Sequence, residues 1–341
     1  MRIAVVGAGA IGAYWGASLY RGGADVHLIA RNDNLRAIQR NGVRVRSPRG
    51  DFVAHPAATD SPAEVGPVDY VFLGLKAHSY PTCGPLVEPL LGPDTAIVAA
   101  QNGIPWWYFH QLPGPYQGHR IEAVDPGGAT SAVLSPERAI GCVVYPATVL
   151  EAPGVVRHLE GTRFSIGEPS GEISARCRAL SDAMVAGALK CPVEPDLRND
   201  IWIKLMGNVA FNPLSALTRS TMVQMCQDPN TRRVVTALME ETLDIAARLG
   251  STPDISIETR LRGAEKVGHH KTSMLQDLEA GKPLELDAIV TAVVELADLT
   301  KATAPTLRTV HAATELLART AGVTPPRGTA YSPQQPQAVL R

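Results

Sequence analysis

A polar stripe crosses an otherwise apolar segment of this sequence. Residues 201–218 read IWIKLMGNVAFNPLSALT, in which Lys204, Asn208 and Asn212 recur at intervals of four. Because a helix turns by ~100° per residue, these side chains share one slowly drifting face. The stripe faces either solvent or a polar cleft, where the ammonium could donate a proton and the amides hydrogen bonds. Pro213 predicts an end or kink of the helix, where freed backbone could line a cavity.

A second group of polar candidates lies in SMLQDLEAGKPLELDAI. Ser273 and Glu285 could act on a ligand, and Glu285 is expected to open a helix over residues 285–300. A carboxylate is favoured at a helix start by the helix dipole alone, so this position does not require a catalytic role. Asp277 and Glu279 are equally plausible as surface acids, and spacing alone does not select Glu285.

The N-terminal segment has the pattern of a phosphate-binding turn. A strand is expected at residues 2–6, followed by GAGAIG at 7–12, a helix and a second strand at 25–30. The three glycines in turn make the tight turn, let the backbone approach a pyrophosphate and permit close helix-strand packing, with phosphate at the helix N-terminus. The expected cofactor contacts here are Gly7, Gly9, Ala10, Ile11 and Gly12.

The residue that closes the second strand indicates which dinucleotide binds. An acidic residue there would bond the ribose 2′-hydroxyl of NAD, whereas an arginine would pair with the 2′-phosphate of NADP. In LIARND this residue is Arg31, which favours NADP(H), although Asp33 follows two positions later. The alternative is a loop arginine that contacts no cofactor.

Further strands must carry residues to the same edge of the sheet. Segments 70–75 and 96–100 have strand character and run into Lys76 and Gln101-Asn102-Gly103. Ligands bind at the carboxyl edge of open α/β sheets, so both ends are candidate contacts, although such residues also make ordinary turns. Segments 139–145 and 162–166 would extend the sheet or add an antiparallel part.

The texture of the chain changes near Asp196. Strand-like runs give way to helical periodicities at 198–211, 229–249, 285–300 and 306–321. The sequence predicts an α/β protein with a Rossmann-like N-terminal domain (1–196) and an all-helical C-terminal domain (197–324) for substrate binding or dimerisation. The remainder (325–341) is rich in Pro and Gln and is expected to be flexible.

Composition limits the classes of partner. With 341 residues and a net charge of −1, the chain has no electrostatic case for nucleic acid or an anionic membrane surface, so a small-molecule partner is expected. Five scattered cysteines without a CxxC pair fit reduced thiols in the cytoplasm, and no metal-ligand spacing appears. The uncharged run 3–20 could be taken for a signal peptide or anchor, but its glycines and single preceding basic residue favour strand-turn-helix.

Together these residues resemble the ketopantoate reductase (2-dehydropantoate 2-reductase) family over nearly the whole chain to about residue 320. The resemblance rests on GAGAIG, LKAHS around Lys76, QNG around Asn102, W-x-K-x-x-x-N-x-x-x-N-P-L at 202–214, and SMLQD followed by E-x-D at 273–287. It implies an NADP-dependent cytoplasmic reductase of ketopantoate, serving pantothenate and coenzyme A synthesis. The helical domains of such enzymes often dimerise, so we keep a homodimer as an expectation.

The resemblance also implies residue roles. Lys204 would protonate the carbonyl oxygen during hydride transfer, and Glu285 would bind substrate and keep the lysine charged. Asn208 and Asn212 would hold hydroxyl and carboxylate groups, and Ser273 the carboxylate. Arg31 would take the 2′-phosphate, while Lys76 and Asn102 would lie near the cofactor and the reacting ketone. Burial lowers the pKa of a lysine and a carboxylate raises it, and the sequence leaves open which effect prevails.

Departures from the family pattern leave the substrate open. The asparagine motif continues into Trp106-Trp107-Tyr108-Phe109, either a pocket wall or a loop-packing cluster, and Val290-Thr291 stands where the family often has Asn-Gly. Asp125-Pro126-Gly127-Gly128 has no role derivable from sequence. One alternative is therefore the same chemistry on another 2-oxo or 3-oxo acid. A non-catalytic NADP(H)-binding sensor is the alternative of another class, although a sensor needs no proton donor.

Overall fold

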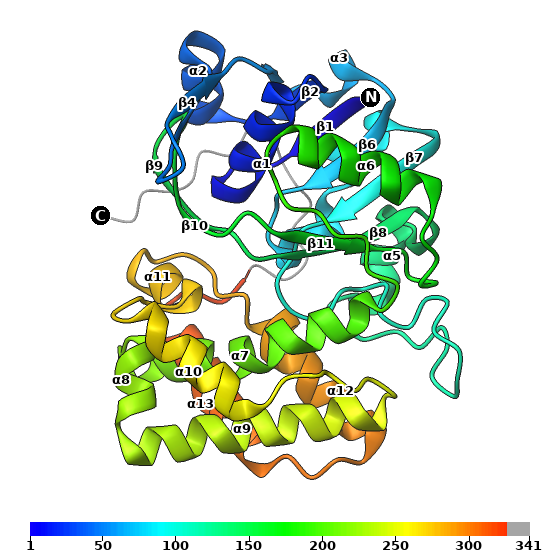
Figure 1. Ribbon diagram of the computed structural model, residues 1–341. Coiled ribbons are helices and arrows are strands. Elements are labelled where there is room, and N and C mark those ends of the chain that lie inside the picture. Colours follow the sequence, from blue (N-terminus) through cyan, green and yellow to red (C-terminus); the bar gives the residue numbers. More distant parts are fainter. Residues whose placement is uncertain (326–341) are drawn as a thin grey trace.

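The computed structural model describes residues 1–325, so the predicted flexible tail, beyond Pro325, lies outside the described residues. An α/β part is stacked on a helical part (Figure 1), which confirms the predicted fold class. The strands are β1 (Arg2–Val6), β2 (Asp25–Ile29), β3 (Val43–Arg46), β4 (Phe52–Ala54), β5 (Ala57–Thr59), β6 (Val68–Leu73), β7 (Leu91–Ala99), β8 (Ala139–Val144), β9 (Ala147–Ala152), β10 (Val155–Glu160) and β11 (Phe164–Gly167). The helices are α1 (Ala10–Arg21), α2 (Asn32–Asn41), α3 (Pro62–Val65), α4 (Gly84–Val87), α5 (Ala129–Val133), α6 (Ala175–Ala186), α7 (Leu197–Thr218), α8 (Met222–Gln227), α9 (Pro229–Arg248), α10 (Ile257–Val267), α11 (Ser273–Glu279), α12 (Ala292–Thr300) and α13 (Pro305–Thr320).

The strand order of the main sheet reverses at its first strand. Within the described residues it has the order β11-β8-β7-β6-β1-β2-β5, parallel throughout except for the antiparallel pair β11 and β8. The chain passes from β1 to β2 on one side and later returns to β6 on the other side of β1. Ligands of open α/β sheets bind at such a switch point, outside the carboxyl ends of the strands.

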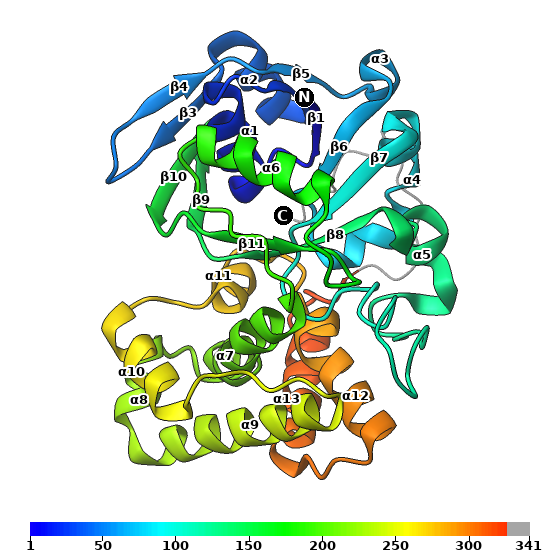
Figure 2. The same cartoon turned by 45° about the vertical axis from the view of Figure 1, so that its right-hand side comes forward.

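A second, smaller sheet was not predicted. Its order is β4-β3-β10-β9, and it packs against α1, where the ring of Tyr14 stacks on that of His158 with centroids 4.6 Å apart. Its strands are short and come from two distant stretches of sequence, so no local pattern joins them. Figure 2 shows α1 and α6 lying beside each other over the main sheet.

The two faces of the main sheet pack into different cores. On β6, Phe72 stacks on Trp15 of α1 with ring centroids 4.1 Å apart, whereas Val71 and Leu73 belong to the core shared with the helical part. Alternate residues of a strand point to opposite faces, so one sheet joins both cores. The shared core fixes the helical part against the carboxyl edge of the strands.

The helical part is organised around α7, which contacts α9, α11 and α13 as well as β8 and β11 (Figure 1). Of the end or kink expected at Pro213, the end is wrong, because α7 continues to Thr218. The helix expected at 285–300 begins just after Glu285, with a π-helical turn at Asp287–Thr291 that leads into α12. Within residues 1–325, no helix is long and apolar enough to cross a membrane.

Candidate active site

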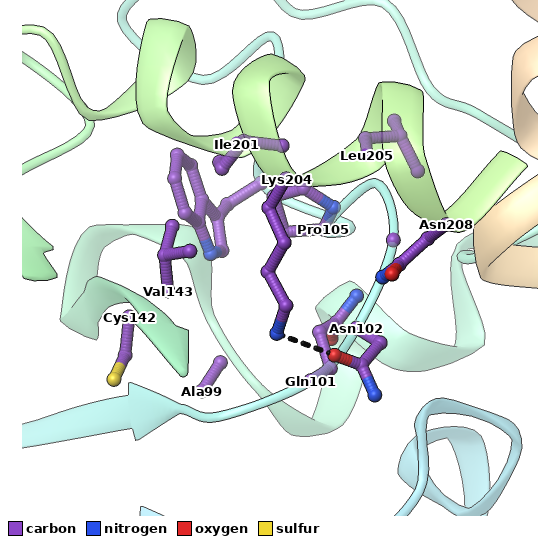
Figure 3. A pocket seen from close by; sticks show the side chains of 12 residues that line it. Ala99, Gln101, Asn102, Pro105, Cys142, Val143, Ile201, Lys204, Leu205 and Asn208 are labelled. Atoms are coloured by element: carbon purple, nitrogen blue, oxygen red, sulfur yellow. Dashed lines mark hydrogen bonds between the residues drawn. The ribbon is translucent and has the colours of Figure 1, made fainter. Parts of the chain in front are cut away.

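Lys204 connects the helical part with the end of the sheet. Its Nζ donates a hydrogen bond to Oδ1 of Asn102 at 2.7 Å and another to the backbone carbonyl of Val144. Asn102 follows β7 and Val144 is the last residue of β8, so α7 points its lysine to the sheet's carboxyl edge (Figure 3). The first residue of the polar stripe therefore faces the edge of the sheet and not bulk solvent.

Asn102 joins Lys204 to Glu285. The side chain of Asn102 accepts from Lys204 and is also hydrogen-bonded to the carboxyl group of Glu285. The next residue, Gly103, has a φ of +88°, and a Cβ there would lie 2.1 Å from the carbonyl oxygen of Ala288. Ile104 N–H donates to that same carbonyl at 2.8 Å. Only glycine fits this contact without displacing the backbone, and the contact holds Asn102 beside the helix that follows Glu285.

The environment brings the pKa values of Lys204 and Glu285 closer together. The pKa of Lys204 is lowered from 10.5 to about 8, chiefly by burial and also by Arg260, whereas Cys142 and Glu285 oppose the shift. Burial likewise raises the pKa of Glu285, against the effects of Lys76, Asn102 and Lys204. For the lysine, desolvation thus outweighs the neighbouring carboxylate. A group with a pKa near the working pH is an efficient proton donor.

A pocket opens around this network (Figure 3). Its lining includes Lys204, Asn102, Asn208 and one large apolar side chain, Trp107. The other lining residues are Ala99, Gln101, Gly103, Pro105, Cys142, Val143, Ile201 and Leu205. A small molecule held here would have polar groups on one side and apolar ones on the other.

Two predicted substrate contacts lie outside the lining of this pocket. Asn212 is one turn further along α7 and only 5% exposed. Ser273 is the first residue of α11 and is exposed. The structure therefore brings together Lys204, Asn208, Asn102 and Glu285, but it does not place Asn212 or Ser273 among the residues around that pocket.

Lys76 links the α/β part of the molecule to the helical part. Its Nζ forms an ion pair with Asp277 of α11 at 2.6 Å and donates to the carbonyl of Pro283 at 3.2 Å. The expectation that Asp277 is a surface acid is therefore wrong, because its side chain is only 16% exposed. Glu279 is partly exposed and pairs with Lys271.

The glycine-rich turn fits a dinucleotide phosphate. Gly7 has a φ of +97°, and a Cβ on Gly12 would lie 2.1 Å from the carbonyl oxygen of Gly7, so the turn packs tightly on α1. A Cβ on Gly9 would meet nothing within 4 Å, which leaves its outer side open. The α1 N-terminus has no side-chain cap and no acidic residue in its first turn. Backbone N–H groups at Ala10 and Ile11 are thus suited to an anion.

Arg31 lies at the N-cap of α2 and is exposed, just beyond the end of β2. Nearby, Asn34 was missed by sequence reasoning. Its Nδ2 donates to the carbonyl of Ala8 at 2.7 Å, and its Oδ1 accepts from the N–H of Gly154 at 2.8 Å. Asn34 therefore braces the glycine-rich turn against the second sheet. Nothing in the sequence pairs these positions, since Gly154 lies 120 residues away.

The aromatic run serves both of its expected uses. Its four side chains are buried, and Trp106 donates to the carbonyl of Leu134 at 2.8 Å, which fits a packing cluster, while Trp107 is part of the pocket wall. Asp125 of the unexplained Asp-Pro-Gly-Gly segment also has a role. Its carboxylate accepts from the N–H groups of Thr130 and Ser131 at 2.8 and 3.1 Å, which caps α5.

Comparison with known proteins assigns the family. Residues 3–171 match the family described as "Ketopantoate reductase PanE/ApbA", and residues 196–318 match its C-terminal domain. The chain belongs to this family. The family assignment confirms the resemblance drawn from the motifs, and the second matched segment begins one residue before α7.

Relatives of the ketopantoate reductase family match over almost their full length. A 2-dehydropantoate 2-reductase from Mesorhizobium japonicum is 48% identical, covering 93% of this chain and 98% of that protein. The solved structure of a candidate ketopantoate reductase from Ralstonia solanacearum MolK2 is 36% identical, with a TM-score of 0.89 over 94% of this chain and 99% of the other. The 2-dehydropantoate 2-reductase of Geobacter metallireducens is 31% identical, with a TM-score of 0.81 over 93% and 100% of the two chains.

Proposed function

We propose that this protein reduces 2-dehydropantoate (ketopantoate) to pantoate with NADPH, a step of pantothenate and coenzyme A synthesis. The observation that carries the proposal is the network of Lys204, Asn102 and Glu285 at a pocket on the carboxyl edge of the sheet. Its relative with 48% identity bears the name of this enzyme. One ammonium, three side-chain amides and an indole line the pocket, and these groups suit a small 2-oxo acid.

The chemistry assigned to Lys204 is protonation of the ketone oxygen. When bound, NADPH supplies the hydride to the carbonyl carbon. The negative charge that develops on oxygen is stabilised and then neutralised by a nearby ammonium. Asn102 and the Val144 carbonyl hold Nζ toward the pocket, and Glu285 counteracts part of the fall in the pKa of Lys204 caused by burial. Lys204 and Glu285 are thus the proposed catalytic pair.

Substrate contacts are assigned first to Asn102 and Asn208, which line the pocket. Roles for Asn212 and Ser273 stay predictions from the family pattern. The tryptophan in the pocket wall favours one second candidate, reduction of a bulkier or more apolar 2-oxo or 3-oxo acid. A non-catalytic sensor has no use for a lysine with a pKa of about 8 at the pocket.

NADP(H) is the proposed cofactor. Gly7, Gly9, Ala10, Ile11 and Gly12 would hold its pyrophosphate. Arg31 would bind the 2′-phosphate at the end of β2. Lys76 would contact the cofactor only by weakening its ion pair with Asp277. The domain division after residue 196, a homodimer and a cytoplasmic location complete the proposal; the last is supported by five cysteines that are all free and buried.

The test is the loss of NADPH absorbance when purified protein receives ketopantoate, with 2-oxoisovalerate as a comparison that lacks the hydroxymethyl group. Fast oxidation selective for ketopantoate supports the proposal and assigns an asparagine to the hydroxyl. Faster oxidation with a larger apolar 2-oxo acid supports the second candidate. A protein that binds NADPH but oxidises it with no oxo acid would refute the reductase proposal.

A further inference from the structure

One charged side chain near the pocket has no assigned role. Arg260 belongs to α10, and among residues 1–325 its guanidinium forms no ion pair within 4.0 Å, while its Nε is buried without a hydrogen-bond partner. Burial lowers the pKa of Arg260, which Tyr145 opposes. A buried guanidinium Nε without a hydrogen-bond partner is costly, and an anion is the partner that this site lacks.

The guanidinium lies against α7 beside the proposed catalytic lysine. A Cβ built on Gly207 would meet Nη2 of Arg260 at 2.3 Å and Nε at 2.5 Å, so the arginine occupies the space that a side chain at this position would take. Gly207 lies three residues after Lys204 and one before Asn208, both of which line the pocket. Arg260 therefore packs on the turn of α7 that carries Lys204 and Asn208, and its charge lowers the pKa of Lys204.

A 2-oxo acid requires a site for its carboxylate close to Lys204. The carboxylate is bonded directly to the ketone carbon, so a substrate whose carbonyl oxygen faces Lys204 must place its carboxylate within a few ångströms of that lysine. An arginine offers two parallel donors that match a carboxylate. Ser273, which the family pattern assigns to the carboxylate, is exposed and outside the pocket lining.

We propose that Arg260 binds the substrate carboxylate, with Gly207 providing the room for its guanidinium. The inference rests on the proposed reductase function and adds the group that selects acids over neutral ketones. Arg260 is thus a binding and specificity residue. It binds the carboxylate, whereas Lys204 protonates the ketone oxygen.

The test compares a 2-oxo acid with its methyl ester in wild-type protein and three variants. In Arg260→Leu, KM for the acid should rise about 10- to 100-fold, the range for a hydrogen bond to a charged group, while kcat and the ester kinetics change little. Gly207→Ala keeps the arginine but displaces it, so KM for the acid should rise in this variant too. Because alanine suits a helix interior better than glycine, the substitution should not weaken α7 itself. Arg262→Leu, an exposed arginine on the same helix, is the matched control.

An unchanged preference for acid over ester in a folded Arg260→Leu variant would overturn the inference. If wild type reduces no 2-oxo acid, the proposed function has failed, and calorimetry decides the inference separately. Ketopantoate binding that is weakened by Arg260→Leu and not by Arg262→Leu would still support an anion site. Equal binding by all variants, or no binding, would refute it.

Discussion

Replacing Lys204 should abolish most of the turnover while leaving the protein folded. Lys204→Met keeps an unbranched chain of similar length but removes the proton that the proposed mechanism needs. General acid catalysis contributes a factor of about 10²–10⁴, so kcat should fall by that amount. NADPH binding should change little, because the glycine-rich turn lies on α1 and not on α7.

The pH dependence provides a sharper measure of the same group. With a pKa of about 8, Lys204 is protonated in about nine-tenths of molecules at pH 7 and about one-tenth at pH 9. Since the protonated form is the donor, kcat/KM should fall tenfold per pH unit above about pH 8. Lys204→Arg retains a positive charge that does not titrate in this range, so its residual activity should show no such fall.

The free energy of unfolding should rise in Lys204→Met, although its turnover falls. The folded state lowers the pKa of Lys204 from 10.5 to about 8, so at pH 7 burial of its charge costs the folded state up to about 3 kcal/mol. Lys204→Met removes that cost, offset by the lost hydrogen bonds. The gain in the free energy of unfolding of Lys204→Met should be complete below pH 8. It should disappear as the pH rises to 10.5, where the lysine of the unfolded wild type also loses its proton.

Both effects can be measured on one set of proteins. Steady-state NADPH oxidation gives kcat and kcat/KM across pH, and urea unfolding at pH 7 and 10 gives the stability difference. Lys190→Met, which replaces an exposed lysine, is the control for the loss of a charge. Turnover by Lys204→Met within about threefold of wild type, or an alkaline limb that persists in Lys204→Arg, would refute the assignment of the general acid.

Three other substitutions separate the remaining groups. Glu285→Gln should lower kcat/KM about tenfold. It should also remove the acid limb of the pH profile, which lies above the ordinary pKa of 4.5 because burial raises the pKa of Glu285. An acid limb that persists in the variant would assign it to another carboxylate. Arg31→Ala should raise KM for NADPH about 10- to 100-fold and leave NADH within about twofold, and equal effects on both would contradict a 2′-phosphate contact. Asp277→Asn should lower the free energy of unfolding in urea by about 1–3 kcal/mol, against under about 0.5 for Asp244→Asn in an exposed ion pair; equal losses would contradict a special role for the contact with Lys76.

Local patterns predicted the elements that form the glycine-rich turn and the helix that carries Lys204. The strands at residues 2–6 and 25–30, the helix between them and the helix that carries Lys204 all follow from periodicity and glycine spacing, which act over a few residues. The second sheet was missed because β3 pairs with β10, more than a hundred residues away, and both strands are short. Pro213 misled because tertiary packing holds α7 through a residue that would end an isolated helix.

The site was predictable in its residue types and not in its connections. Lys204, Asn102 and Glu285 were named from motifs, but no spacing shows that Asn102 accepts from the lysine and bonds the carboxyl group as well. The pKa of Lys204 also depends on how far water is excluded from its side chain, which only the three-dimensional structure shows. Arg260 left no trace in the sequence, since an arginine on an amphipathic helix is ordinarily solvated.

The contacts that assemble the site are also the contacts that join the two parts of the molecule. Lys204 bonds the end of β8, Gly103 packs on the helix after Glu285, and Lys76 pairs with Asp277. Any opening of one part away from the other would therefore separate the lysine from Asn102 and restore water around it. Without burial the pKa of Lys204 would return toward 10.5 and the driving force for proton transfer would fall. In the proposed mechanism, forming the cleft and lowering the pKa of Lys204 would thus be one event, and the acid would be competent only in the closed arrangement.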